Sequence, residues 1–224
     1  MIVVVGSRHD PVAAALVREW PDSALCRAED ITAPGWLCRN DHGPLRWVVE
    51  GQAVQDDEVT GIFVRRCAFY PEEFLSTHRE DRVFLAAEAQ AFLGFVLSRT
   101  RATVANPPRD GALGGEGLGF EHWMPAAVRE GLPIRPFRLA GGRRRLARPE
   151  RPPLAVEVVG DEAFGDAPAG LKDAATRLAR ALGLVWAAFL FDGRRRLMAL
   201  TVAAEPGPQA RRALGNLLAR RREA

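Results

Sequence analysis

The sequence is poor in lysine, cysteine and histidine, and these shortages exclude several kinds of site. Lys172 is the only lysine among 31 basic residues, so nearly all of the positive charge is arginine. The three cysteines and four histidines form no Cys-x-x-Cys or His-x-x-x-His pattern, which argues against a zinc site. An odd number of cysteines, in a chain that opens on the strand-like MIVVV without an export signal, predicts reduced thiols and a cytoplasmic protein.

Long apolar runs are also missing. No stretch approaches the roughly 20 uninterrupted apolar residues that a membrane helix needs, so we expect no membrane-spanning segment. The 224 residues are nevertheless 47% hydrophobic, which is enough for one sizeable core or two small ones.

The net charge is small, and the charged residues are unevenly distributed along the chain. The net charge is +3, yet the arginine-rich segments 138–151 and 210–224 carry +5 and +4. Such clusters could bind phosphates or an acidic partner. No aromatic residues are interleaved with them, which argues against a nucleic-acid-binding protein.

Apolar periodicity predicts strands that alternate with helices, the pattern of an α/β fold. The buried run 2–5 is followed by Asp10 and Pro11, which are suited to the cap and the first position of a helix. Further strands are expected at 46–50, 60–66 and 102–106, with the longest helix of the first half over 82–98. Its apolar groups are Phe84, Ala87, Ala91, Phe92 and Phe95.

The second half continues the alternation. Helices are expected over 120–128 and 171–182, ending at Gly131 and Gly183, with a strand at 154–160 between them. Two strands then flank an Asp-Gly pair, which is a strong hairpin signal. A last helix has an apolar edge at Leu214, Leu217 and Leu218.

Four stretches, taken in order over roughly 60 to 208, carry a resemblance to a known family. They are GIFVRR with DRVFLAAEAQAFLGFVLS, VANPPRDGALGGEGLGFEHWMPAAVREGLPIRP, AVEVVGDEAFG, and LARALGLVWAAFLFDG. Together they resemble the peptide-modifying ATP-grasp ligases, which include cyclases of ribosomally made peptides and glutamate ligases acting on proteins. The resemblance implies a pre-ATP-grasp-like α/β domain over 1–107, followed by a reduced ATP-grasp-like domain over 108–224 with a basic terminal helix.

The sequence departs from this family where the family holds ATP. Members of the family use lysines to bind the phosphates, but the region after Asn-Pro reads GGEGLGFEHW, without lysine. The strand that would carry a second lysine should lie between 136 and 154, an interval that is too short. Part of the subdomain that covers the nucleotide is therefore expected to be deleted.

The metal ligands of the family are missing as well. The family implies an Asp in the strand after Gly-Leu, where this chain has Leu190, and then a Glu and an Asn two residues apart. The second pair aligns with Ala199 and Thr201, or with Thr201 and Ala203 after a shift of two. Mg²⁺ requires hard oxygen ligands, which neither register supplies. The nearby carboxylates of Asp192 and Glu205 lie in a turn and beyond the strand, and we do not expect them to be ligands.

These departures predict a pseudoenzyme: a noncatalytic ATP-grasp-like protein that binds a substrate peptide or a partner enzyme during peptide or natural-product maturation, without a cofactor or metal. Arg65, Arg66 and Asn106 are the expected ligand-binding residues. For the arginine pair, a structural ion pair with Glu72, Glu73 or Glu88 is an open alternative.

The sequence leaves two other functions open. An active carboxylate-amine ligase with relocated ligands would release ADP in the presence of an acceptor, and a nucleic-acid-associated protein would bind through the arginine clusters. The apolar edge of the terminal helix would suit a partner or a second copy in a homodimer; the alternative is packing on the chain's own sheet.

Overall fold

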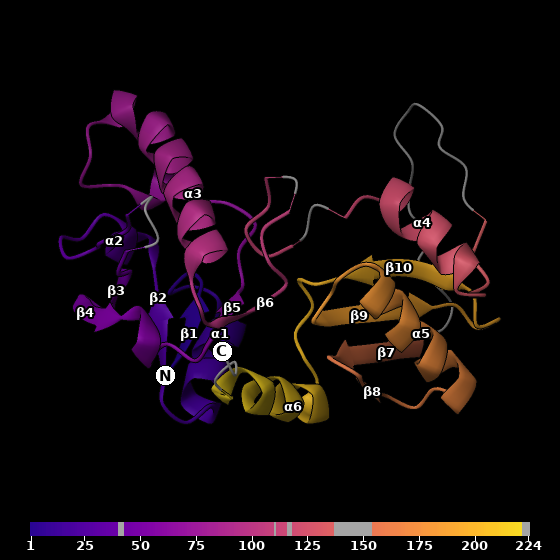
Figure 1. Cartoon of the computed structure of the whole chain (residues 1–224). Helices are drawn as coiled ribbons and strands as arrows, with labels where there is room; N and C mark the ends of the chain where they lie inside the picture. Colours follow the sequence, from indigo (N-terminus) through magenta and orange to yellow (C-terminus); the bar gives the residue numbers. More distant parts are fainter. Residues whose placement is uncertain (40–42, 110, 116–117, 137–153, 221–224) are drawn as a thin grey trace. The chain divides into compact units, whose positions relative to one another are not determined.

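The computed structural model describes residues 1–39, 43–109, 111–115, 118–136 and 154–220. By their internal contacts the residues form two compact units, the first comprising Met1–Gly117 with Arg211–Ala224 and the second Leu118–Ala210 (Figure 1). The predicted domain boundary after residue 107 stays a prediction. No described helix combines the length and the apolar character needed to cross a membrane.

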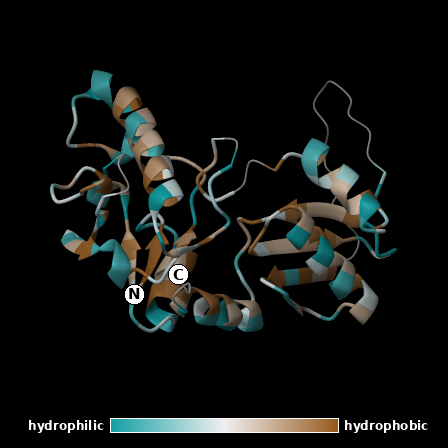
Figure 2. Ribbon diagram, in the orientation of Figure 1, coloured by the Kyte–Doolittle hydropathy of each residue, from teal (hydrophilic) through white to brown (hydrophobic). Residues whose placement is uncertain are grey.

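The first unit is built on a parallel four-stranded sheet with the order β2-β1-β5-β6. The strands are β1 (Ile2–Val5), β2 (Ser23–Cys26), β5 (Gly61–Val64) and β6 (Thr103–Ala105), and all three neighbouring pairs are parallel. Every residue of β1 and β5 is buried, as expected for strands covered on both faces. Figure 2 shows hydrophobic colour concentrated on these strands.

Helices cover both faces of this sheet. On one face α1 (Pro11–Glu19) begins at the predicted cap, because Asp10 accepts a hydrogen bond from the Val12 amide at 2.9 Å. On the other face lie α2 (Ala28–Ile31), α3 (Arg82–Arg99) and the hairpin of β3 (Arg46–Val49) and β4 (Gln52–Gln55). The short 3-10 helices η1 (Asp56–Glu58), η2 (Pro71–Glu73) and η3 (Arg79–Asp81) lie in the connections.

The terminal helix α6 (Pro208–Ala219) packs on this same unit, beside α1. Its Leu214 and Leu218 are fully buried, and the Trp20 indole donates to the Arg211 carbonyl at 3.0 Å. A Cβ at Gly61 would lie 2.5 Å from the Leu218 Cβ, so the glycine allows this close approach. The apolar edge of the helix is therefore used within the chain, which was the alternative to docking on a partner.

Helix α3 has the predicted extent but a different buried side. Its core residues are Ala86, Ala89, Leu93, Val96 and Leu97. Of the apolar groups in the predicted pattern, only Phe92 packs against the core, whereas Phe84 is 69% exposed and Phe95 is 41% exposed. The periodicity predicted the helix correctly. Because the helix carries apolar residues on two sides, the pattern could not show which side is buried.

The second unit is an antiparallel sheet with the order β10-β9-β7-β8. Its strands are β7 (Leu154–Val159), β8 (Glu162–Phe164), β9 (Trp186–Phe191) and β10 (Leu197–Thr201). The predicted Asp-Gly hairpin joins β9 to β10. Helix α5 (Ala169–Ala181) packs on the sheet and contacts α4 (Phe120–Arg129), as Figure 1 shows.

Candidate functional site

The sheet of the first unit brings several polar loops to its carboxyl edge. Strands β1 and β5 are neighbours, but the chain turns from β1 toward β2 on one side and continues from β5 toward β6 on the other. In open α/β sheets such a switch point leaves a crevice beyond the strand ends, where ligands bind. Residues 7–9 follow β1, and Arg65 and Arg66 follow β5.

Arg65 lies on the α1 side of the sheet. Its Nε lies 3.2 Å from Asp10 Oδ2, and the same carboxylate caps α1 through its other oxygen. The arginine side chain is only 10% exposed, so the ion pair is shielded from water. This contact fixes the loop after β5 against the beginning of α1.

Arg66 points to the opposite side of the sheet. Its guanidinium bonds Glu73, donates from Nε to the Ala68 carbonyl at 3.0 Å and lies 4.0 Å above the Phe69 ring. The ion pair with Glu73 is thus one of the alternatives left open by the sequence. The Arg66 side chain is 7% exposed, and its buried Nη1 makes no hydrogen bond to any described residue.

Asn106 follows β6 on the same edge. It is 2% exposed and has a positive φ of 58°, a conformation that asparagine tolerates better than most residues. A Cβ at Gly115 would lie 2.8 Å from the Asn106 Cβ, so the glycine-rich segment passes closely over it. The structure therefore brings all three predicted residues to one edge, with Arg65 and Arg66 on opposite faces.

A cavity of about 290 Å³ opens at this edge. Its walls include Ser7, Arg8, Arg27, Glu29 and Glu72, so charges of both signs face it. Arg8 pairs with Glu29 at 3.2 Å across exposed side chains. Apart from the polar character of the loop after β1, no local signal in the sequence predicts this cavity.

The second unit places the expected metal positions together, but none of them carries a carboxylate or an amide side chain. Leu190 of β9 is directly opposite Ala199 of β10, and Thr201 is opposite Ala188 two residues along. Because side chains alternate along a strand, Leu190, Ala199 and Thr201 share one face. No group of three or more His, Cys, Asp or Glu residues in the described part of the chain could hold a metal ion.

The carboxylates near this face have structural roles. Asp192 accepts hydrogen bonds from the amides of Arg194 and Arg196 at 2.9 Å each, and from the Arg196 guanidinium. Burial raises the Asp192 pKa, but these hydrogen bonds outweigh it and hold the pKa below its usual value. Glu157 accepts from the Gly207 amide at 2.8 Å. Within the described part of this unit, the residues at these positions therefore do not fit a magnesium–triphosphate complex.

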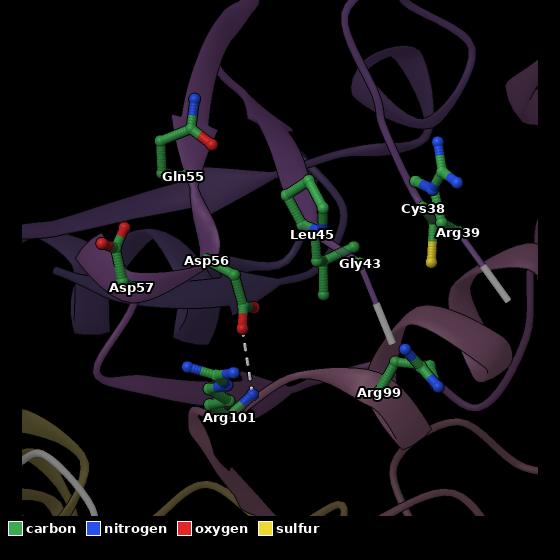
Figure 3. A pocket seen from close by; sticks show the side chains of 10 residues that line it. Cys38, Arg39, Gly43, Leu45, Gln55, Asp56, Asp57, Arg99 and Arg101 are labelled. Carbon is green, nitrogen blue, oxygen red and sulfur yellow. Dashed lines mark hydrogen bonds between the residues drawn. The ribbon is translucent and has the colours of Figure 1, made fainter. Parts of the chain in front are cut away.

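A second pocket, of about 460 Å³, lies at the opposite, amino-terminal edge of the first sheet, where α3 ends before β6 (Figure 3). Three arginines line it: Arg39, Arg99 and Arg101. Cys38 is also in the wall, and burial raises the pKa of its thiol despite the positive charge of Arg99.

Asp56 connects the elements that form this pocket. Its carboxylate accepts hydrogen bonds from Trp47 Nε1 at 2.9 Å, Thr100 Oγ1 at 2.6 Å and the Arg101 amide at 3.0 Å. The last of these is the dashed line in Figure 3. These donors join the β3 hairpin, the end of α3 and the start of β6. The partners lie 9 to 45 residues from Asp56, so no local sequence signal could reveal them.

The fold is that of ATP-grasp ligases that act on peptides. The macrocyclase MdnC from Microcystis aeruginosa MRC, bound to the precursor peptide MdnA, is 12% identical with a TM-score of 0.69 over 97% of this chain and 98% of its own. The ligase PsnB with a minimal precursor is 14% identical, with a TM-score of 0.67 over 97% of each chain.

A RiPP-associated ATP-grasp ligase from Chryseobacterium gregarium, in complex with ADP and a leader and core peptide, extends this likeness. It is 10% identical with a TM-score of 0.67 over 100% of this chain and 98% of its own. No protein-family model matches the sequence, and no curated protein is significantly similar to it. The resemblance and the α/β fold expected from the sequence are confirmed.

Proposed function

We propose that this chain is a noncatalytic ATP-grasp-like binding protein in the maturation of a peptide or a peptide-derived natural product. The observation that carries the proposal is the pairing of Leu190 with Ala199 where the resembled family implies carboxylates. Phosphoryl transfer depends largely on positioned cations and their ligands. With apolar side chains at these positions and a single lysine in the chain, that chemistry has little support.

The proposed ligand is a substrate peptide or the enzyme that modifies it. Supporting this, the similar structures described above hold precursor peptides. The cavity at the carboxyl edge of the first sheet presents both arginine and glutamate side chains, which suits a peptide segment of mixed charge. In this proposal Arg65, Arg66 and Asn106 shape the ligand-binding edge.

Calorimetric titration with Mg-ATP tests the loss of nucleotide binding. We expect no saturable heat up to about 1 mM nucleotide, a level at which a site would need only about 4 kcal/mol of binding free energy. Micromolar binding would overturn the proposal. ADP release that depends on an added peptide would instead favour the active carboxylate-amine ligase.

A restoration experiment tests whether the residues at positions 190, 199 and 201, and not the fold, account for the expected absence of metal binding. The triple variant Leu190→Asp, Ala199→Glu, Thr201→Asn places three oxygen ligands on one sheet face. We expect Mn²⁺ binding, measured by paramagnetic resonance, in this variant and not in the natural chain. A matched control introduces the same residue types at exposed positions of α5, for example at Ala169 and Ala181.

Peptide binding is tested with the precursor peptide encoded nearest to the gene. Fluorescence anisotropy of the labelled peptide should show saturable binding that Arg8→Ala weakens about tenfold, the effect of losing one well-placed ionic contact. Arg212→Ala, on the exposed side of α6, is the control. Failure of the peptide to bind either this chain or a mixture of the chain with its neighbouring ligase would contradict the proposal.

A further inference from the structure

The second pocket gathers arginine side chains from two segments that are distant in the sequence. Arg99 ends α3 and Arg101 follows shortly after it, whereas Arg39 belongs to the loop before β3. Figure 3 shows Arg39 beside Cys38, apart from the two arginines at the end of α3. A basic residue in the last turn of a helix is commonly explained by the helix dipole, which is negative there. The dipole accounts for Arg99, but it does not explain why Arg39 lines the same pocket.

Positive charge exceeds negative charge in the described wall of this pocket. Three guanidinium groups are present with two carboxylates, those of Asp56 and Asp57. The buried Asp56 carboxylate already accepts hydrogen bonds from Trp47, Thr100 and the Arg101 amide, whereas Asp57 is exposed to solvent. Because like charges that converge disfavour each other, an anion held among the arginines would be favoured.

The backbone that carries two of the arginines is fixed in the folded chain. The Thr100 amide donates to the Val96 carbonyl at 3.0 Å, and Asp56 accepts from the Thr100 hydroxyl and the Arg101 amide. The chain from Arg99 to Arg101 is therefore held from both sides. A site built on such a preformed backbone loses less conformational entropy when a ligand binds.

We propose that the second pocket is a binding site for a small organic polyanion, a molecule that carries two or more phosphate or carboxylate groups. The planar guanidinium forms paired hydrogen bonds with either group, so both share the same chemistry of recognition. A cavity of about 460 Å³ is within the range of small-molecule sites and has room for more than one such group. The described wall residues include no aromatic side chain on which a base could stack, which favours a ligand without a nucleobase.

This site is separate from the peptide-binding edge of the proposed function. The cavity beside Arg8 lies beyond the carboxyl ends of the strands of the first sheet, whereas the second pocket lies at their amino ends. Loss of anion binding would therefore leave peptide binding unchanged, and the two proposals can fail independently.

Calorimetric titration of the full chain with pyrophosphate and, separately, with citrate tests the site. Mg²⁺ is left out, because it would occupy the oxygen atoms that the arginines bind. We expect at least one of the two anions to bind saturably at low salt with a dissociation constant of about 0.1 mM, and added salt to weaken the binding by screening the charges. A preference for pyrophosphate would assign the site to phosphate groups, and a preference for citrate to carboxylates. No saturable heat from either anion up to about 5 mM would refute the proposal.

Arginine variants test whether the anion binds in this pocket. Arg39→Ala and Arg101→Ala should each raise the dissociation constant about tenfold, the effect of losing one charge-assisted contact. Both side chains are exposed, so neither change should unfold the chain. The matched control, Arg18→Ala, removes an exposed arginine from the last turn of α1, outside the pocket. If all three variants weaken binding equally, the anions respond only to the net charge of the chain, and the proposed site is wrong.

Alkylation of Cys38 provides a second, local measurement. Cys38 is in the pocket wall and Cys26 is buried, so Cys67→Ser leaves Cys38 as the accessible thiol. A saturating concentration of the anion that binds should slow the reaction of Cys38 with iodoacetamide about threefold or more, because added negative charge disfavours the thiolate and the occupied pocket excludes the reagent. Mass spectrometry measures this rate. An unchanged rate would place the bound anion elsewhere on the chain and would overturn the assignment.

Discussion

Replacing Asp56 with alanine should destabilise the first unit by about 3 kcal/mol, whereas the same change at its neighbour Asp57 should have almost no effect. Asp56 is buried and accepts three hydrogen bonds, while Asp57 is exposed. The Thr100 hydroxyl can turn to another acceptor after the change. The Trp47 indole cannot, because its side chain is completely buried, and a buried donor left without an acceptor costs about 1–3 kcal/mol.

The lost bond to the Arg101 amide accounts for the rest of the estimate. Asp56→Asn separates the two contributions. The side-chain carbonyl of the asparagine can still accept from the Trp47 indole, but its NH2 group would face the Arg101 N–H, so two donors would meet. We expect it to lose about half as much, roughly 1–2 kcal/mol.

Urea denaturation followed by tryptophan fluorescence measures these differences. With an m-value of about 1–3 kcal/mol/M, a loss of 3 kcal/mol lowers the midpoint by about 1–3 M. The rings of Trp47 and Trp36 lie 5.4 Å apart in the first unit, tilted by 50°, so their emission follows the part of the chain that the substitution affects. Equal midpoints for Asp56→Ala and Asp57→Ala would show that these hydrogen bonds do not support the fold as argued.

Three further perturbations have defined outcomes. Gly61→Ala should cost about 1–3 kcal/mol and make the terminal helix sensitive to limited proteolysis, because the new Cβ collides with Leu218; unchanged protection would contradict the packing of α6. Asp192→Ala should cost about 0.5–1 kcal/mol at pH 7. Since hydrogen bonds lower the Asp192 pKa in the folded state, this difference should vanish as the pH falls below 3.8, which acid titration of stability checks. Ellman's reagent should react rapidly with Cys67 in the folded chain, and Cys67→Ser should remove this fast phase. Cys26 should react only after unfolding, because burial and the nearby Asp30 carboxylate raise the pKa of the Cys26 thiol far above its usual range.

Local signals in the sequence predicted much of the fold correctly. Asp10 and Pro11 start α1, the Asp-Gly pair forms the turn between β9 and β10, and Gly131 and Gly183 adopt positive φ values of 75° and 66° just beyond their helices. Each of these features depends on the conformational preference of one or two residues, so it can be read without knowing the rest of the chain.

Features that depend on distant residues could not be predicted. Strands β2 and β4 are four residues long, and their exposure follows no simple alternation, so they have no periodic signature. The buried side of α3 was ambiguous because apolar residues occupy both sides, and the choice is made by packing against the sheet. The three arginines of the second pocket are separated by up to 62 residues and meet only in the folded chain.

The cross-strand pair of Leu190 and Ala199 is compatible with this sheet in the absence of any bound metal. Carboxylates placed opposite each other on neighbouring strands repel, and only a bound cation makes the arrangement favourable. Leu190 and Ala199 carry no charge, so their cross-strand contact is neutral or favourable without any ligand. Replacing buried charged groups by apolar ones is often neutral or stabilising. Under the function proposed above, uncharged residues at these positions therefore keep the antiparallel sheet stable without a metal ion.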